Sequence, residues 1–212
     1  SEILTNNLFG VDVNSESVEI AKLSLWIKTA RRGKVLDSLD ANIRVGDSLI
    51  EDSNFAYRAH GFEWKTAFPD IFAAGGFDVV LGNPPYIRYQ DFRGKQRAQS
   101  RRAALHAGVT LSALASSWAA FTVHSALFLT PGGRMALVLP AELLSVNYAA
   151  AVRKFLFDRF ASVELVMFDE QVFPGAEADV VLLLADAPPQ LDRGGPQYDA
   201  SMVAALGKGI KI

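Results

Sequence analysis

The stretch FDVVLGNPPYIR, residues 77–88, decides the fold because it joins a buried strand to a rigid polar corner. Residues 77–82 form a short apolar run of the kind that predicts a buried strand. Pro84 and Pro85 follow shortly after, and consecutive prolines fix φ and lack backbone N–H donors, so the chain is expected to stay extended. Because ligands of open α/β sheets bind at the carboxyl ends of strands, a binding site is expected at this corner.

The corner offers oxygen acceptors to a planar amino group. The Asn83 side-chain amide and an unpaired main-chain carbonyl can together accept both hydrogens of one –NH2 group. Accepting both hydrogens favours a more tetrahedral and more nucleophilic nitrogen. An amine that is conjugated to an aromatic ring is otherwise a poor nucleophile. Tyr86 supplies a flat ring on which a planar substrate can stack. The plainer interpretation is a turn that only ends the strand, because Asn-Pro is common in turns.

Outward from this corner, short aliphatic runs alternate with longer helical patterns. This alternation predicts an α/β domain in three layers, with a largely parallel sheet between helices. The short link between the last two strands favours an antiparallel pair, because a parallel crossover needs a dozen residues or more. Besides residues 77–82, strands are expected at residues 8–13, 43–45, 134–139, 163–168 and 180–184.

Three helices can be placed by their apolar periodicity. The first begins at Asn14 or Ser15 and ends near Gly33, and the others cover residues 118–129 and 143–160. The first helix is expected to pack through an apolar stripe made of Val18, Ala21, Leu25 and Trp26. Residues 51–76 are aromatic and irregular, and their pattern does not assign them to a helix or a strand.

Two carboxylates follow the first two expected strands. Asp12 closes the strand at residues 8–13, where a carboxylate commonly holds the two hydroxyls of a nucleoside ribose. Asp47, in the segment GDSL at residues 46–49, ends the next strand and could accept a hydrogen bond from the amine of a bound adenine. The alternative for Asp12 is a residue that merely neighbours the helix N-cap.

Composition excludes several classes of site. With 212 residues, the chain suits one α/β domain, and the absence of cysteine excludes disulfides, thiolate metal sites and cysteine nucleophiles. Three histidines fall at unrelated spacings, so no metal is expected. Neither a secretory signal nor a long apolar span is present in the sequence, which leads us to expect a cytoplasmic location.

The net charge of −2 conceals one strongly basic segment. Between residues 88 and 102, a cluster of basic side chains is opposed only by Asp91. The cluster can form a phosphate-contacting arm, because basic side chains near a polyanion release its counterions, or simply a solvated loop and helix. Its members are Arg88, Arg93, Lys95, Arg97, Arg101 and Arg102.

Taken together, residues 8–26, 46–49 and 82–88 resemble the N6-adenine DNA methyltransferases. The resemblance is to the large gamma-class catalytic domains of type I and type IIG restriction–modification systems, and it covers roughly residues 6–186, including residues 132–140 and 173–175. It implies a Rossmann-like fold, S-adenosylmethionine as cofactor, and double-stranded DNA with a flipped adenine as substrate, because a base inside a duplex is unreachable.

The resemblance also implies roles for individual residues. The matching Asp12 binds the cofactor ribose and Asp47 its adenine, while Asn83 and Pro84 hold the target amine and Tyr86 stacks on the flipped base. The expected cofactor-binding residues are Asp12, Val13, Asp47, Ser48 and Asn83. The expected catalytic residues are Asn83, Pro84, Pro85 and Tyr86, and the expected DNA-binding residues are those of the basic segment.

The glycine-rich first motif of that family is absent before residues 8–13. In the family, this motif contacts the methionine part of the cofactor, and its strand lies at the centre of the sheet. We therefore expect residues 1–186 to be a partial catalytic domain without its central first strand, inactive in isolation, and residues 187–212 to be a linker. A specificity or nuclease domain or subunit is expected outside this chain.

Other functions stay open at this point. Protein-glutamine methyltransferases that act on release factors share Asn-Pro-Pro-Tyr, but Leu25-Trp26 and the basic segment disfavour them. RNA base methylation and a degenerate, non-catalytic DNA-binding subunit of the same fold are further alternatives. A nicotinamide-dependent oxidoreductase is disfavoured, because the phosphate-binding glycines are missing.

Overall fold

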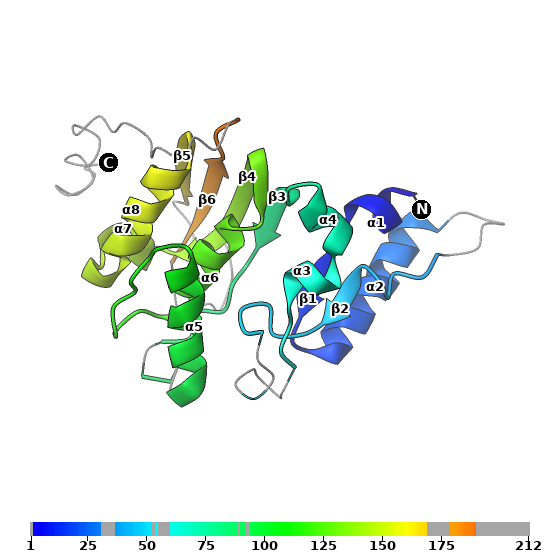
Figure 1. The fold of residues 1–212 in the computed structure, drawn as a ribbon, viewed down its shortest axis with the longest axis horizontal. Coiled ribbons are helices and arrows are strands. Elements are labelled where there is room, and N and C mark those ends of the chain that lie inside the picture. Colours follow the sequence, from blue (N-terminus) through cyan, green and yellow to red (C-terminus); the bar gives the residue numbers. More distant parts are fainter. Residues whose placement is uncertain are drawn as a thin grey trace. The chain divides into compact units, whose positions relative to one another are not determined.

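The computed structural model describes residues 2–30, 37–51, 54, 60–88, 90–91, 94–168 and 179–189. The chain divides into two compact units, Ser1–Ala67 and Phe68–Ile212, and each contains its own sheet (Figure 1). No helix in the described part of the chain is long and apolar enough to cross a membrane.

The first unit is built around a two-stranded parallel sheet. Its elements are α1 (Glu2–Asn7), β1 (Gly10–Asp12), α2 (Ser15–Thr29), β2 (Ile43–Val45) and α3 (Trp64–Ala67). The register pairs Asp12 with Val45, so both strands end at the same edge. Asn14 is the N-cap of α2, because its side chain accepts hydrogen bonds from the backbone N–H groups of Glu16 and Ser17.

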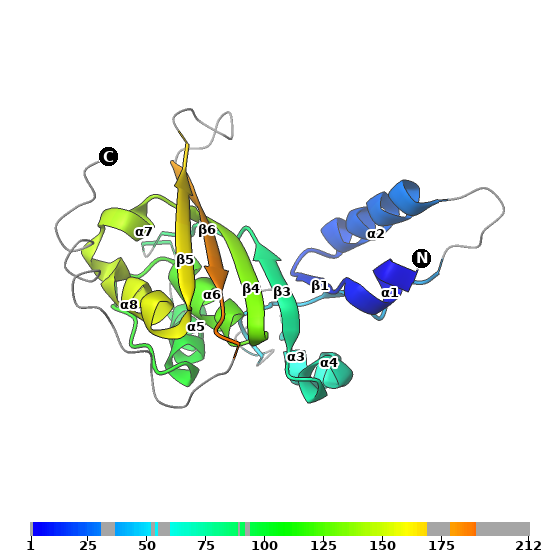
Figure 2. The same ribbon diagram turned by 90° about the horizontal axis from the view of Figure 1, so that it is seen from above.

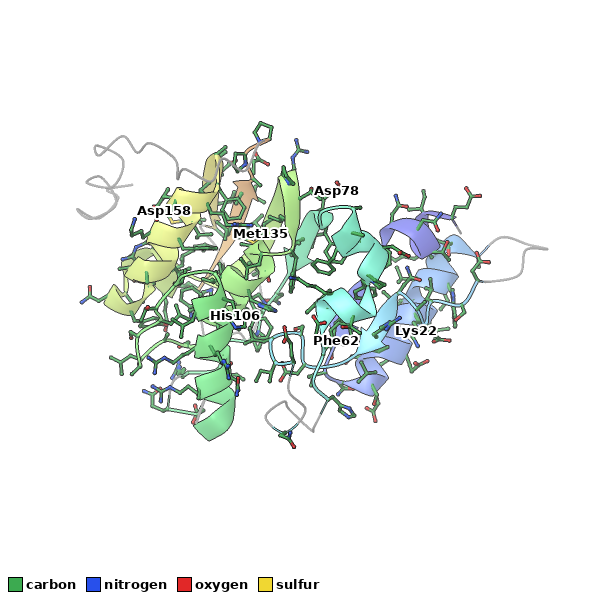
Figure 3. All side chains as sticks on the ribbon, in the orientation of Figure 1. Lys22, Phe62, Asp78, His106, Met135 and Asp158 are labelled. Carbon is green, nitrogen blue, oxygen red and sulfur yellow. The ribbon has the colours of Figure 1, made fainter. Side chains whose placement is uncertain are left out.

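Val18, Leu39 and Ile43 form the buried core of this unit, with Leu4, Leu25 and Trp26 packed against it. The predicted stripe of α2 was wrong at Ala21, which is exposed, because Lys22 takes the buried position instead. The Nζ of Lys22, a residue labelled in Figure 3, lies 2.7 Å from Glu19 Oε1 and 2.5 Å from Asp40 Oδ1. The hydrogen bonds to Asp40 and Glu19 raise the pKa of Lys22, so the buried stem carries a charged, paired end.

The second unit contains a mixed four-stranded sheet of order β3-β4-β6-β5. Its strands are β3 (Phe77–Gly82), β4 (Leu129–Pro140), β5 (Ser162–Met167) and β6 (Val180–Asp186). β3 is parallel to β4, whereas β6 runs antiparallel to both β4 and β5. The predicted antiparallel pair at the end of the chain is therefore confirmed.

The helices of the second unit are α4 (Pro69–Ala73), α5 (Gly94–His106), α6 (Ser117–Ala126), α7 (Glu142–Ser145) and α8 (Ala150–Arg159), with the 3-10 turn η2 (Asn147–Ala149). Within this unit, α5, α6 and α8 lie on one side of the sheet (Figure 2). Met135, Leu137 and Leu139 alternate along β4 and are almost fully buried. Their β6 partners are buried as well, so this face forms the core, where each large side chain contributes roughly 1.5–3 kcal/mol.

Two predicted helices of this unit had wrong boundaries. The helix expected over residues 118–129 ends at Ala126, and β4 begins already at Leu129 and turns through Gly132 with φ 74°. The single helix expected over residues 143–160 is broken at Val146, which is extended with φ −77° and ψ 144°. The Arg153 guanidinium donates to the carbonyls of Leu143 and Val146 at 2.8 and 3.1 Å, and these bonds satisfy carbonyls that a continuous helix would have paired.

Candidate active site

The polar corner follows β3 directly, as predicted. Asn83 and Pro85 are exposed, Pro84 is buried, and Tyr86 is half-buried. The buried proline fixes the corner against the unit, while the Asn83 amide remains reachable by a ligand. An Asn83 side chain inside the core would have been incompatible with any role toward a substrate.

The Tyr86 phenol ties this corner to β4. Its hydroxyl donates to the carbonyl of Val138 at 2.9 Å, and Asn83 Oδ1 lies 3.2 Å from the same hydroxyl oxygen. The single phenolic hydrogen favours the shorter bond, so Asn83 Oδ1 keeps capacity to accept from another donor. Burial raises the pKa of Tyr86, which keeps the phenol protonated and able to donate at neutral pH.

Ser117, which the sequence did not single out, fastens the far side of the corner. Its hydroxyl accepts from the backbone N–H of Ile87 at 2.9 Å and donates to the carbonyl of Pro85 at 2.5 Å. Its own backbone N–H donates to the carbonyl of Ile87 at 3.1 Å. The only sequence signal would have been a serine at a helix start combined with a loop that lacks N–H donors.

The two candidate cofactor carboxylates lie at one edge of the β1–β2 sheet. Asp12 ends β1 and pairs in register with Val45, and Asp47 follows Val45 by two residues. The exposed Asp12 side chain accepts from the N–H of Asn14 at 2.7 Å, so it also shapes the turn into α2. Asp47 accepts from the N–H of Leu49 at 3.1 Å. Val13 and Ser48 adjoin these carboxylates in sequence.

An aromatic pair that the sequence did not place closes on the Asp47 loop. Trp64 Nε1 donates to the carbonyl of Ser48 at 2.9 Å, and its ring meets Phe62 edge-on with centroids 5.3 Å apart. Gly46 lies against Phe62, where an added Cβ would approach the ring within 2.6 Å. Segment 60–64 therefore holds the loop from the side, although only the aromatic density of residues 51–76 hinted at such a role.

The basic segment is only partly described. Arg88 is exposed, and Arg101 and Arg102 are exposed on α5, where Arg97 is half-buried. Arg97 and Arg101 are four residues apart and share one helix face. Among the described residues, no carboxylate forms an ion pair with these α5 arginines. Arg93 and the side chain of Lys95 lie outside the described residues, as do residues 173–175 and 190–212.

Curated proteins with similar sequences are named as type II methyltransferases. The chain is 26% identical over 125 residues to the type II methyltransferase M.HincII of Haemophilus influenzae, an alignment that covers 58% of this chain and 25% of that protein. It is 31% identical over 102 residues to the type II methyltransferase M.XamI of Xanthomonas campestris pv. amaranthicola, covering 47% of this chain and 19% of that protein. The chain spans about a quarter or less of the length of these relatives.

Among solved structures, the cryo-EM structure of a DrdV–DNA complex has a similar fold. The TM-score is 0.65 at 15% identity, and the match covers 89% of this chain and 21% of that one. This likeness and that to the EcoKI M protein of a type I restriction enzyme, with a TM-score of 0.53, confirm the predicted methyltransferase fold. Residues 6–173 also match a family described as Eco57I restriction-modification methylase. Because this match extends over well more than half of the 212 residues, the chain belongs to the Eco57I restriction-modification methylase family.

Proposed function

We propose that this chain is most of the catalytic domain of a DNA methyltransferase that transfers a methyl group from S-adenosylmethionine to adenine N6 in a restriction–modification system. The observation that carries the proposal is the exposed Asn83 amide on a corner that is fixed by the buried Pro84 and by the hydrogen bond from the Tyr86 hydroxyl to the Val138 carbonyl. This arrangement offers fixed oxygen acceptors and an aromatic ring, which suit a flat amino group.

The first unit carries groups that fit the cofactor. An exposed carboxylate at the end of β1 suits the vicinal hydroxyls of a ribose, and Asp47 in the neighbouring loop suits an adenine amine. Val13 and Ser48, which adjoin Asp12 and Asp47 in sequence, would lie beside the ribose and the adenine. S-adenosylmethionine supplies an electrophilic methyl group on a sulfonium when it is bound. The 212 residues contain no counterpart of the family's glycine-rich motif, so we expect the isolated chain to bind the cofactor weakly and to be inactive.

The corner would act on the target amine by accepting its hydrogens. Asn83 Oδ1 and the Pro84 carbonyl would each accept a hydrogen bond from one N–H of the amine. These bonds would draw the nitrogen lone pair out of conjugation and make it available to the methyl donor. Pro85 keeps the backbone extended, and the Tyr86 ring stacks on the extruded base at a gain of roughly 1–3 kcal/mol. In a direct transfer, a bond would form between the amine nitrogen and the methyl carbon as the carbon–sulfur bond breaks; the sulfur would keep that electron pair as a thioether, and the nitrogen would release one proton to solvent.

The basic segment would hold the DNA backbone. Arg88 and the α5 arginines are suited to phosphate contacts, which position a duplex without reading its sequence. The solved DrdV structure with a similar fold is a complex with DNA. We further propose that residues 1–186 form a partial catalytic domain followed by a linker at residues 187–212. Sequence specificity, and any nuclease, would reside in another domain or subunit of a cytoplasmic system.

The test is methyl transfer by the intact enzyme to unmethylated genomic DNA. Labelled S-adenosylmethionine is supplied, and the digested DNA is analysed by mass spectrometry for N6-methyladenine and N4-methylcytosine. N6-methyladenine is expected, and Asn83→Ala should lower turnover by about a hundredfold to a thousandfold, as loss of a positioning acceptor does. Parallel reactions contain RNA or a release factor in place of DNA. Label in one of these but not in DNA, N4-methylcytosine in place of N6-methyladenine, or full activity of Asn83→Ala would contradict the proposal.

A further inference from the structure

The corner cannot fasten itself with its own backbone. Pro84 and Pro85 have no N–H, so the first donors after Asn83 belong to Tyr86 and Ile87. Two acceptors that must take two hydrogens of one amine need fixed positions, because a displacement of about 1 Å can cost a hundredfold in rate. The fastening therefore has to come from another part of the fold.

Ser117 supplies bonds on both sides of Tyr86. Its hydroxyl donates to the Pro85 carbonyl at 2.5 Å and accepts from the Ile87 N–H at 2.9 Å. A hydroxyl has one donor and two acceptor sites, so it can make both bonds at once. The third bond, from the Ser117 N–H to the Ile87 carbonyl at 3.1 Å, closes the backbone against the start of α6.

The base of this attachment is rigid. Ser117 is 1% exposed and is the first residue of α6, and the next residues, Trp118 and Ala119, are both 0% exposed. Side chains so well packed leave the hydroxyl little freedom to turn away. A buried hydrogen bond is also costly to break, because its partners would be left without water.

We propose that Ser117 is a positioning residue for methyl transfer, acting as a clamp that holds segment 85–87 so that Asn83 and Pro84 face the target amine. Its effect on turnover rests on the proposed function, whereas its effect on the loop does not. Together with the bond from the Tyr86 hydroxyl to the Val138 carbonyl, the clamp accounts for how the double-proline corner keeps one conformation.

The loop itself gives the first test, which needs no activity. In the intact enzyme, hydrogen exchange of the Ile87 amide is measured by mass spectrometry of short peptides. Ser117→Ala should speed this exchange at least tenfold, because the acceptor is lost. Thr122→Val is the matched control: Thr122 is 0% exposed on the same helix, and its hydroxyl bonds to the Trp118 carbonyl at 2.9 Å, away from the corner. The control should leave Ile87 exchange unchanged.

Steady-state methylation of unmethylated genomic DNA gives the second test. Ser117→Ala should lower kcat about tenfold to a hundredfold with the KM for S-adenosylmethionine within twofold, and Thr122→Val should keep both. Ser117→Cys, which retains a weak donor and a similar volume, should fall between the wild type and Ser117→Ala, and it serves if the alanine variant folds poorly.

The outcomes separate this inference from the proposed function. Unchanged Ile87 exchange in Ser117→Ala overturns the clamp. Faster exchange with unchanged kcat overturns its positioning role. A wild-type enzyme that methylates no DNA overturns the proposed function instead, while the exchange result still decides whether the clamp exists.

Discussion

The two units hold their candidate binding groups in place by different means. In Ser1–Ala67, the carboxylates of Asp12 and Asp47 are oriented by backbone N–H groups only two residues further along the chain. In Phe68–Ile212, the corner is fastened by the Val138 carbonyl and the Ser117 hydroxyl, which lie 52 and 30 residues from their partners. A local turn thus shapes the group at Asp12, and the Asp47 loop combines a local turn with the bond from Trp64 to Ser48, whereas the proposed target groups are shaped by the tertiary fold.

This difference agrees with the size of each core. The first unit pairs two three-residue strands over a small cluster, and a two-stranded sheet is marginally stable by itself. The second unit packs four strands against several buried helices. Damage to the packing of the second unit should therefore disturb the chemistry of the corner, while the geometry of Asp12 should depend mainly on its own turn.

The largest expected effect comes from Gly76, at the turn into β3. Its φ is 123°, and an added Cβ would overlap the carbonyl oxygen of Phe128, which is backbone and cannot rotate away. Gly76→Ala should lower the free energy of unfolding of the second unit by about 3 kcal/mol, from steric overlap and backbone strain. Native-state hydrogen exchange of β4 amides measures it.

Gly75→Ala is the matched control for that change. Gly75 has a similar φ of 106°, but its nearest neighbour is Thr130 Cγ2 at 3.9 Å. The backbone strain alone should cost about 1–2 kcal/mol. Equal losses in the two variants would show that the overlap relaxes freely and that the packing of this turn is not decisive.

A change at Asp12 tests the first unit, where a local turn orients the candidate carboxylate. Asp12→Asn keeps an oxygen that can accept from the Asn14 N–H but removes the charge. If the carboxylate binds ribose hydroxyls, affinity for S-adenosylmethionine should fall by about 1.5–3 kcal/mol, roughly ten- to a hundredfold, with β4 exchange unchanged. Calorimetric titration of the intact enzyme measures it. Glu16→Gln, which removes a carboxylate from the first turn of α2, should bind normally, and normal binding by Asp12→Asn would reject the role.

The sequence was most informative where structure is local. The strand at residues 77–82, the corner at Asn83 and the final antiparallel pair follow from short patterns and were predicted. The break at Val146 depends on Arg153, and the buried place of Lys22 depends on Asp40, 18 residues away, so no local pattern marks them. Ser117 and Trp64 were missed for the same reason, because each acts on a partner distant in sequence.

Removing the Tyr86 hydroxyl should have a smaller effect than the changes above. Tyr86→Phe loses the bond to the Val138 carbonyl and should cost about 1 kcal/mol of stability and up to about tenfold in kcat. Burial raises the pKa of Tyr86, so the folded state holds this proton more tightly than the unfolded state, whose value is 10.0. The stability contribution is therefore present below pH 10 and is lost as the pH rises beyond it. Tyr86→Phe should lack that alkaline loss, and identical alkaline profiles would reject the assignment.

The smallest expected effect lies in the first unit, at the bond between Lys22 of α2 and Asp40. Lys22 holds the pKa of Asp40 below its usual 3.8, with a further contribution from the Ser38 hydroxyl, and Asp40 in turn raises the pKa of Lys22 above 10.5. Because its pKa is lowered, Asp40 stabilises the fold above pH 3.8, and this contribution is lost as the pH falls. Because its pKa is raised, Lys22 stabilises the fold below pH 10.5, and this contribution is lost as the pH rises.

Asp40→Asn should therefore speed hydrogen exchange of the Val18 amide slightly at neutral pH, and this difference should vanish in acid. Glu19→Gln removes the partner within the helix and should do less, because it leaves the link to residue 40 intact. A larger effect from Glu19→Gln would mean that the bond between Lys22 and Asp40 contributes less than the bond within the helix.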